Sequence, residues 1–581
     1  MFLSLINLLC ILFKIGEANV RYYSDPLPRP QELKWGPSGP IELDFSLAVE
    51  INPPSELVEN AFNRMVHSIT QLKWQNPMDQ DVHQTQGQIA GESLKRISSV
   101  QIRLTNTSET LQMGADESYE ITLSGNASVI KISASVWGCL HAFSTLRQMV
   151  QYDERSSKYF FEADAYVRDW PLYAHRGIMI DSARNFLTPE VILDQIDIME
   201  LSKMNVLHWH LVDSQSWPIA LSTYPEMTKG AYSSREVYTK EDIEYIVAYA
   251  FQRGVRIIPE IDMPGHARAG YYSLNKSLLA CADMWKTDHS CAYAVEPPSG
   301  QLEILLNETY KVVSNIYTEV SGFFKDNWFH VGADELQEKC YDNSTLTKEW
   351  FSDNGTRTFH DLVQHWVDHA LPIFESFPNR KVIMWEDIMM SSAKANHVPK
   401  SVIMQCWASG TDCAQNLTDQ GYSVIMSKSD FLYLDCGYGG WLTNDDRYTE
   451  TPENYRFNHG KGGSWCGPYK TWQRIYNFNI TANLTLEQSE KVLGAEAAMW
   501  GEQTDSTVLI SKIWPRTAAL AESLWSGNSD PETGLLRTGD MTQRILVFRE
   551  FLVALGYPAS PLAPKFCLQN PRGCDICTST P

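Results

Sequence analysis

The chain has 581 residues, too many for one ordinary domain but enough for a barrel of about 250–400 residues with a smaller partner. Apolar residues make up 43% and charged residues 20%, a balance typical of a globular enzyme. The formal net charge of −22 argues against nucleic acid as a partner, because a polyanion would be repelled. A soluble protein with a neutral ligand fits this charge.

The first residues are typical of a signal peptide. Phe2 to Phe13 is almost entirely apolar, and Gly16 and Ala18 form a small-x-small cleavage site. A run of this length is too short to span a bilayer. We therefore expect residues 1–18 to be removed, the mature chain to begin near Asn19, and no membrane span.

Sequons and cysteines agree with export. Asn-x-Ser/Thr sequons occur at Asn106, Asn126, Asn275, Asn307, Asn343, Asn354, Asn416, Asn479 and Asn483. Together they predict a secreted glycoprotein, either extracellular or in the periplasm or cell wall. Eleven cysteines remain once Cys10 leaves with the signal peptide, and disulfides are expected in that oxidising compartment. Cys574 and Cys577 form a C-x-x-C pair, for which a disulfide or free thiol is favoured over zinc.

Residues 19–168 carry the pattern of a small α/β domain. Strand-like runs cover 41–47, 100–104, 119–123 and 129–132, and helical patterns cover 58–72 and 140–149. The sequence does not reveal a function for this domain. We expect it to pack against the larger one.

Residues 169–558 carry eight strand-like runs with helices between them. The runs are 177–181, 205–213, 255–262, 328–335, 381–387, 402–407, 422–427 and 492–499. Thr188, followed by Pro189, and Thr239 are predicted helix N-caps. The fold class is therefore α/β, a (β/α)8 barrel after the small domain, with residues 559–581 as a C-terminal extension.

The predicted carboxyl ends of the barrel strands carry carboxylates and tryptophans, and these ends face the active site in such barrels. They are Asp181, Asp213, Asp262 with His266, Asp334 with Glu335, Trp385 with Glu386 and Asp387, Trp407, Tyr433 with Asp435, and Trp500 with Glu502. One acid at a strand end is most often a helix cap. The whole set favours a sugar-binding site.

His208 and His210 would share one face of the second strand and are the obvious metal candidates. No third ligand is placed by spacing, so a packed histidine pair is favoured and neither metal nor cofactor is predicted.

If the site binds a sugar, Asp334 and Glu335 are the residues expected to carry the chemistry. Neighbours on a strand point to opposite faces, so the two would not straddle one glycosidic bond. A substrate whose 2-acetamido oxygen attacks the anomeric carbon removes this difficulty.

Five motifs resemble the family 20 glycoside hydrolases, the β-N-acetylhexosaminidases. They are RGIMIDSARN at 176–185, NVLHWHLVD at 205–213, DMPGH at 262–266, HVGADE at 330–335 and AMWGE at 498–502. The order is right, and the resemblance covers nearly the whole mature chain. Segments 295–302, 433–437 and 465–472 look most like secreted fungal members, with insect chitin-degrading members next. Ala333 stands where glycine is also common.

The resemblance implies an exo-acting, retaining enzyme that removes terminal N-acetylglucosamine, or N-acetylgalactosamine, from chitooligosaccharides or glycoconjugates. Glu335 would be the general acid and then base, Asp334 would orient the acetamido group, and Tyr433 would hydrogen-bond its oxygen. Asp213 and His266 would support Glu335. The implied binding residues are Trp385, Trp407 and Trp500 as walls, Arg176, Asp435 and Glu502 at the ring hydroxyls, and Trp465, Val295 and Glu296 under the next sugar.

By the same resemblance the disulfides would be Cys281–Cys340, Cys436–Cys466 and Cys567–Cys574, with Cys291 as another candidate in the first. Fungal members suggest a homodimer, and the oligomeric state stays open. Two rival hypotheses are a non-catalytic N-acetylglucosamine-binding protein on a hydrolase scaffold and a family 18-type chitinase. The acidic D-x-x-D-x-D-x-E run of the latter is not present in the sequence.

Overall fold

The computed structural model describes residues 25–37, 39–77, 94–285, 292–408, 410, 412–435, 441 and 469–576. The predicted signal peptide, Trp465 and the pair Cys436–Cys466 lie outside the described residues, as do Cys291 and Cys577. For Asp435 only the backbone is described. No helix in this part of the chain is long and apolar enough to cross a membrane.

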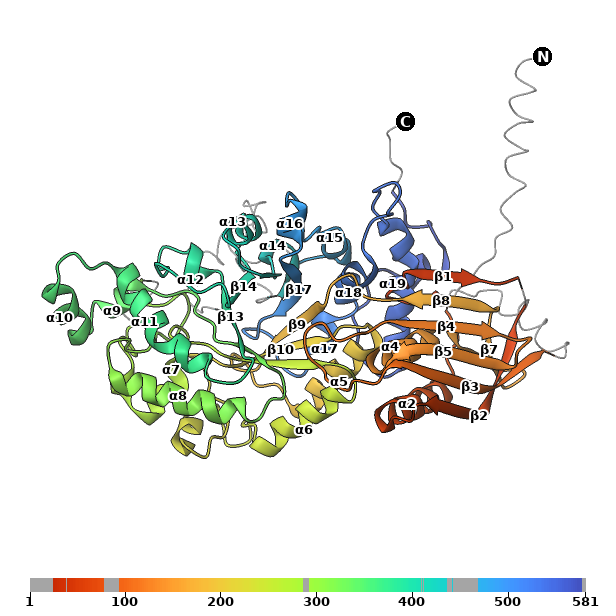
Figure 1. Cartoon of the computed structure of the whole chain (residues 1–581), viewed down its shortest axis with the longest axis horizontal. Coiled ribbons are helices and arrows are strands. Elements are labelled where there is room, and N and C mark those ends of the chain that lie inside the picture. Colours follow the sequence, from red (N-terminus) through yellow and green to blue (C-terminus); the bar gives the residue numbers. More distant parts are fainter. Residues whose placement is uncertain are drawn as a thin grey trace, which may run out of the picture.

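The N-terminal domain contains an eight-stranded mixed sheet in the order β1-β8-β4-β5-β3-β2-β7-β6, and its described residues include the helices α2 and α4 (Figure 1). Alternation in β4 is typical of a half-buried strand, because Tyr119, Ile121 and Leu123 are buried whereas Glu120 and Thr122 are exposed. The elements are β1 (Glu32–Trp35), β2 (Ile41–Asn52), α2 (Glu56–Leu72), β3 (Lys95–Asn106), β4 (Tyr119–Ser124), β5 (Val129–Ser135), α4 (Val136–Met149), β6 (Gln151–Asp153), β7 (Lys158–Phe161) and β8 (Ala165–Asp169).

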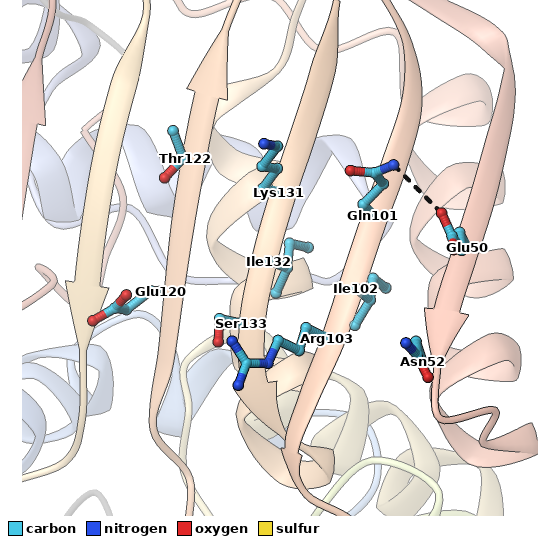
Figure 2. Close-up of a pocket in the computed structure, with 10 residues that line it drawn as sticks. All are labelled: Glu50, Asn52, Gln101, Ile102, Arg103, Glu120, Thr122, Lys131, Ile132 and Ser133. Carbon is cyan, nitrogen blue, oxygen red and sulfur yellow. Dashed lines mark hydrogen bonds between the residues drawn. The ribbon is translucent and has the colours of Figure 1, made fainter. Parts of the chain in front are cut away.

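The outer face of this sheet is polar. Figure 2 shows Glu50, Gln101, Lys131 and Thr122 across a shallow hollow, where the Gln101 amide donates to Glu50 at 3.4 Å. Side chains of both charges alternate there, which is the composition of a solvated surface. The hollow is formed by β2 to β5 alone, so it belongs to the small domain rather than to the barrel.

Eight parallel strands form a closed barrel, and each of the eight predicted runs contributes one strand. The strands are β9 (His175–Asp181), β10 (Val206–Val212), β11 (Arg256–Ile261), β12 (Trp328–His330), β13 (Lys381–Trp385), β14 (Ile403–Cys406), β15 (Val424–Met426) and β17 (Val492–Met499). Strand β16 (Tyr433–Asp435) pairs with β17 outside the ring. Strand β12 ends at His330, five residues before the predicted end.

The helices lie around the barrel, and the last of them follow β17 along the chain (Figure 1). They are α5 (Pro189–Leu201), η1 (Pro225–Gly230), α6 (Lys240–Phe251), α7 (Arg268–Leu274), η2 (Lys276–Leu278), α8 (Asn307–Ser321), α9 (Glu338–Tyr341), α10 (Thr345–Asp353), α11 (Phe359–Phe374), α12 (Asp387–Met390), α13 (Cys413–Asp419), α14 (Ser429–Leu432), α15 (Trp472–Tyr476), α16 (Leu486–Ser489), α17 (Leu509–Ile513), α18 (Thr517–Ser526), α19 (Thr538–Ala554) and α20 (Lys565–Gln569). Thr239 caps α6 through a capping box, as predicted. Thr188 is the N-cap of α5, but its side chain makes no capping hydrogen bond.

An N-terminal segment, residues 25–31, ties the two domains together. The backbone N–H of Leu27 donates to Gln148 of the small domain at 2.9 Å. The backbone N–H of Arg29 donates to Glu522 on α18 at 2.8 Å, and the Gln31 amide donates to the carbonyl of Trp525 at 2.9 Å. The segment therefore bonds to both domains.

Candidate active site

The segment that follows β12 brings the two central carboxylates to one place. Gly332, Ala333 and Glu335 have φ values of 67°, 74° and 52°, so the extended backbone is interrupted here. A Cβ at Gly332 would lie 1.6 Å from Oδ1 of Asp262, which only glycine avoids. Because this segment is not a strand, the rule that neighbours face opposite ways does not apply.

Asp334 and Glu335 instead share one histidine. Nε2 of His266 lies 3.2 Å from Oε2 of Glu335 and 3.8 Å from Oδ2 of Asp334. Burial raises the pKa of Asp334 to about 6; the charge of His266 works against this rise, and that of Glu335 adds to it. Asp262 is buried beside this segment. Its Oδ1 accepts a hydrogen bond from the backbone N–H of Ala333 at 3.2 Å.

Asp213 contacts His266 on the ring nitrogen opposite the one that faces Glu335. Its Oδ1 lies 3.2 Å from Nδ1 of His266, and its Oδ2 lies 3.0 Å from Nε2 of His210. Burial alone would lower the pKa of His266, but the charge and hydrogen bond of Asp213 raise it well above its ordinary value. The contacts on both ring nitrogens fix the orientation of the histidine that contacts Glu335, and Asp213 favours its charged form.

Four aromatic side chains from separate segments gather beside these acids. Trp385, Tyr433 and Trp500 are buried in one cluster with the partly buried Trp407 against it. Ring centroids of Trp407 and Tyr433 lie 6.1 Å apart and stacked, and those of Trp385 and Trp500 also lie 6.1 Å apart. Apolar ring faces with a nearby phenol match an acetamido group and a sugar face.

Asp387 is a site residue that the sequence placed at a strand end without giving it a role. Its Oδ2 accepts from the Trp407 indole at 2.5 Å, and its Oδ1 accepts from the backbone N–H of Glu335 at 3.4 Å. Burial and the charge of Asp334 raise the pKa of Asp387 to about 8. Asp387 thus links Trp407 to the segment that carries Asp334 and Glu335.

The prediction for Arg176 is wrong. Arg176 lies near the start of β9, is fully buried, and pairs with Glu117 of the small domain at 2.5 Å. Its guanidinium also donates to the carbonyls of Lys203 and Tyr173. An arginine at the amino end of a barrel strand is remote from the carboxyl-end site, so Arg176 joins the domains instead.

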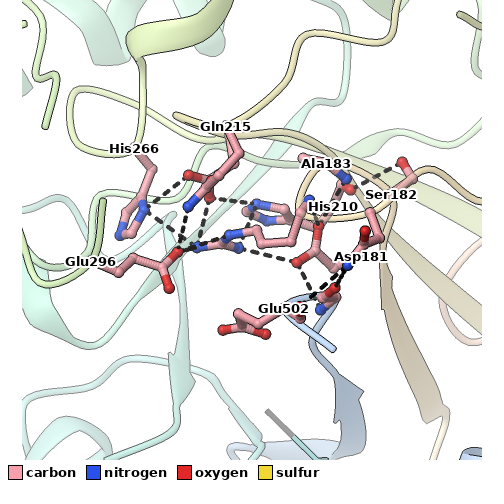
Figure 3. A network of polar contacts seen from close by, with 12 residues as sticks. Asp181, Ser182, Ala183, His210, Gln215, His266, Glu296 and Glu502 are labelled. Atoms are coloured by element: carbon pink, nitrogen blue, oxygen red, sulfur yellow. Dashed lines mark hydrogen bonds and ion pairs between the residues drawn. The ribbon is translucent and has the colours of Figure 1, made fainter. Parts of the chain in front are cut away.

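Arg184 occupies the place that Arg176 was expected to fill. It follows the carboxyl end of β9 and lies 2.8 Å from both Asp213 and Glu296 and 3.3 Å from Asp181. Figure 3 shows Asp181, His210, His266, Glu296 and Glu502 in one polar network. The signal that could have identified Arg184 is its position three residues after a strand-end acid.

Glu296 and Glu502 are two further acids at the edge of this network. Burial, reinforced by the charge of Glu296, raises the pKa of Glu502 well above its ordinary range. Gln215 donates to Glu296 at 3.0 Å and to the carbonyl of Pro297 at 2.9 Å, which fixes this segment. Val295 beside it is 43% exposed, so it can contact a bound molecule.

Three disulfides are present in the described chain. Cys281–Cys340 and Cys567–Cys574 were predicted, whereas Cys406–Cys413 was not. The third closes a short loop directly after β14, next to Trp407. Spacing alone could not pair these cysteines without the turn that brings them together.

All nine sequon asparagines are exposed, and their occupancy stays a prediction.

Several groups of three ligand-type side chains lie close together. The groups include His208–Glu260–His330 and Asp213–His266–Glu296. In the first, His208 and His330 each lie 3.0 Å from Glu260; in the second, Arg184 already places a positive charge 2.8 Å from Glu296. In both groups the polar side chains thus already contact one another or Arg184.

Comparison with known families decides what this site belongs to. Residues 173–528 match the catalytic domain of glycosyl hydrolase family 20, and residues 26–149 match the domain described as beta-acetyl hexosaminidase like. The chain belongs to glycosyl hydrolase family 20. The resemblance read from the motifs is confirmed, and the family 20 assignment replaces the family 18 alternative.

Similar proteins and structures agree with the family. The family 20 chain is 44% identical over 593 residues to a beta-hexosaminidase of Emericella nidulans, with 98% of each chain covered. It is 34% identical to a chitooligosaccharidolytic beta-N-acetylglucosaminidase of Bombyx mori, over 82% of this chain and 78% of the other. A Flavobacterium johnsoniae chitobiase structure matches with a TM-score of 0.71 and 25% identity, covering 92% of this chain and 73% of that one. The family 20 chain is thus a glycosidase, an exo-acting β-N-acetylhexosaminidase.

Proposed function

We propose that this enzyme releases terminal β-linked N-acetylglucosamine with Glu335 as general acid and base and with Asp334 as the partner of the acetamido group. The observation that carries the proposal is the shared contact of both carboxylates with Nε2 of His266, within 3.8 Å. Carboxylates that act as acid and nucleophile flank the bond. Two that lie side by side suit a substrate that supplies its own nucleophile.

The reaction then proceeds in two displacements. The acetamido oxygen attacks the anomeric carbon, the bond to the leaving oxygen breaks, and Glu335 gives that oxygen its proton. Asp334, as a carboxylate, accepts a hydrogen bond from the acetamido N–H and stabilises the positive oxazolinium ion. Water then attacks the anomeric carbon, Glu335 takes a proton from it, and the acetamido group is restored. Two inversions give net retention.

The remaining residues have binding roles in the proposal. Trp385, Trp407 and Trp500 would enclose the acetamido methyl and the sugar face, and Tyr433 would hydrogen-bond the acetamido oxygen. Arg184, in place of Arg176, would hold ring hydroxyls with Glu502. Asp435 stays a proposed partner of the ring hydroxyls, and Trp465, Val295 and Glu296 stay proposed contacts of the next sugar.

Chitooligosaccharides and the ends of glycoconjugates carry the required sugar, and the Bombyx mori relative favours the first class. We further propose that the enzyme is secreted and glycosylated. The three disulfides of the described chain support an oxidising compartment. A homodimer stays a proposal from the fungal resemblance.

Proton NMR of the early reaction mixture tests the mechanism. Hydrolysis of a chromogenic β-N-acetylglucosaminide should first yield the β-anomer of N-acetylglucosamine, before mutarotation. An initial α-anomer would overturn the proposed double displacement. Absence of turnover would instead favour the non-catalytic sugar-binding alternative.

A further inference from the structure

Two glutamates are buried in the interior of the barrel, close to the candidate site. Glu260 on β11 is 0% exposed and Glu496 on β17 is 1% exposed. Both contact His208, at 3.0 Å from Glu260 and 2.7 Å from Glu496. Glu496 also lies 3.2 Å from His175 and accepts from Gln405 at 2.8 Å. The two carboxylates thus have similar burial and share a partner.

Glu260 also contacts His330 at 3.0 Å, but it differs from Glu496 because two of its partners belong to the site. Its Oε1 accepts from the indole N–H of Trp385 at 2.9 Å, and Trp385 is one of the clustered aromatic side chains. Its Oε2 lies 2.5 Å from Nδ1 of His210. One carboxylate therefore fixes both an aromatic wall and a histidine of the polar network.

From His210 a continuous series of contacts leads to the proposed acid. Nε2 of His210 lies 3.0 Å from Asp213, and Asp213 lies 3.2 Å from Nδ1 of His266. Nε2 of His266 lies 3.2 Å from Glu335. Figure 3 shows His210 and His266 in the same network. Glu260 is four contacts from Glu335.

The charge on His210 makes this series depend on Glu260. Burial alone would lower the pKa of His210, but the carboxylate of Glu260 raises it well above the ordinary value. An imidazolium donates from both ring nitrogens, whereas a neutral imidazole donates from one. With Glu260 ionised, His210 can donate to Glu260 and Asp213 together. Without that charge, a neutral His210 can donate to only one of the two, and its contact with the other must change direction or be lost.

We propose that Glu260 is a positioning residue for the acid–base step, acting through His210, Asp213 and His266 on Glu335. The proposal rests on the role proposed above for Glu335. Glu260 touches no reacting atom and acts by holding the relay and Trp385 in place. Its loss should therefore weaken general acid catalysis more than it weakens the rest of the reaction.

The test compares Glu260→Gln with the matched variant Glu496→Gln. Both changes neutralise one buried carboxylate with little change of shape. We would measure kcat/KM on chitobiose, whose leaving group needs protonation, and on a dinitrophenyl N-acetylglucosaminide, whose leaving group does not. Glu260→Gln should lose at least about tenfold more on chitobiose, a fraction of the 10²–10⁴ typical of general acids. Glu496→Gln should lose equally on both.

Equal losses of Glu260→Gln on the two substrates, or the same dependence in Glu496→Gln, would overturn the proposal. If Glu260→Gln does not fold, His210→Gln interrupts the series one residue later and must show the same dependence. A uniform loss in that variant would also overturn it. Glu335→Gln run in parallel separates the two proposals: without a leaving-group dependence there, the role of Glu335 itself fails.

Discussion

The two ends of the barrel both contain buried charges. At one end acids are paired with cations, and at the other they lie beside further acids. At the amino end Arg176 pairs with Glu117 at 2.5 Å and Lys203 pairs with Asp169 at 2.7 Å. The charge of Arg176, opposing burial, lowers the pKa of Glu117 to about 2. At the carboxyl end acids crowd together, and the pKa of Asp334 rises to about 6. Balanced charges join the domains, whereas the crowded acids raise one another's pKa and cost stability when they are ionised.

Asp334→Asn should give the largest effect. Activity should fall by at least about 10²-fold, because an amide cannot stabilise the oxazolinium ion by charge. The ionised carboxylate costs the fold on the order of 3 kcal/mol above pH 6, given its raised pKa. The melting temperature at pH 7.5 should therefore hold or rise. Asp169→Asn at the amino end is the control and should lower it, and equal losses of stability in both variants would contradict the comparison.

Arg176→Met tests the paired end. It leaves Glu117 buried without its cation, which typically costs about 3–5 kcal/mol. Urea unfolding should show this loss, while KM of the folded enzyme stays unchanged. Arg184→Met should do the reverse in kinetics, raising KM for an aryl N-acetylglucosaminide. A raised KM in Arg176→Met would restore Arg176 to the substrate site.

Over a single pH unit, the pH dependence of activity is the smallest of the expected effects. In the proposed mechanism Asp334 acts as a carboxylate, so kcat/KM should fall about tenfold per pH unit below about pH 6. Stability from this group runs the other way. It is fully present below the ordinary pKa of 3.8 and is lost as pH rises through about 6. A profile that stays flat from pH 6 to pH 4 would show that Asp334 does not need its charge.

Much of the architecture could be predicted because long runs carry clear periodicity. The eight barrel strands follow from apolar runs bounded by helix signals, and the strand-end rule placed Asp213, His266 and the tryptophans. The strands β6, β7 and β8 were not predicted. They have only three to five residues each, too few to establish an alternating pattern.

The misjudged residues depend on contacts that spacing does not contain. Arg176 and Arg184 lie at opposite ends of one segment, and only the fold shows that the first faces Glu117 and the second faces Asp213. The orientation of Asp334 and Glu335 depends on positive φ at Gly332, Ala333 and Glu335. The sequence of residues 328–335 has the pattern of one continuous strand, so the turn at 332–335 could not be predicted from it.

The N-terminal segment has a consequence for biosynthesis. Arg29 bonds to Glu522 across 493 residues of chain. At about 5–20 residues per second, the ribosome needs on the order of 25–100 s to make that partner after Arg29. During that interval residues 25–31 can bond to the small domain at Gln148 but not yet to α18. A segment that is synthesised early is therefore among the last to make all of its final contacts.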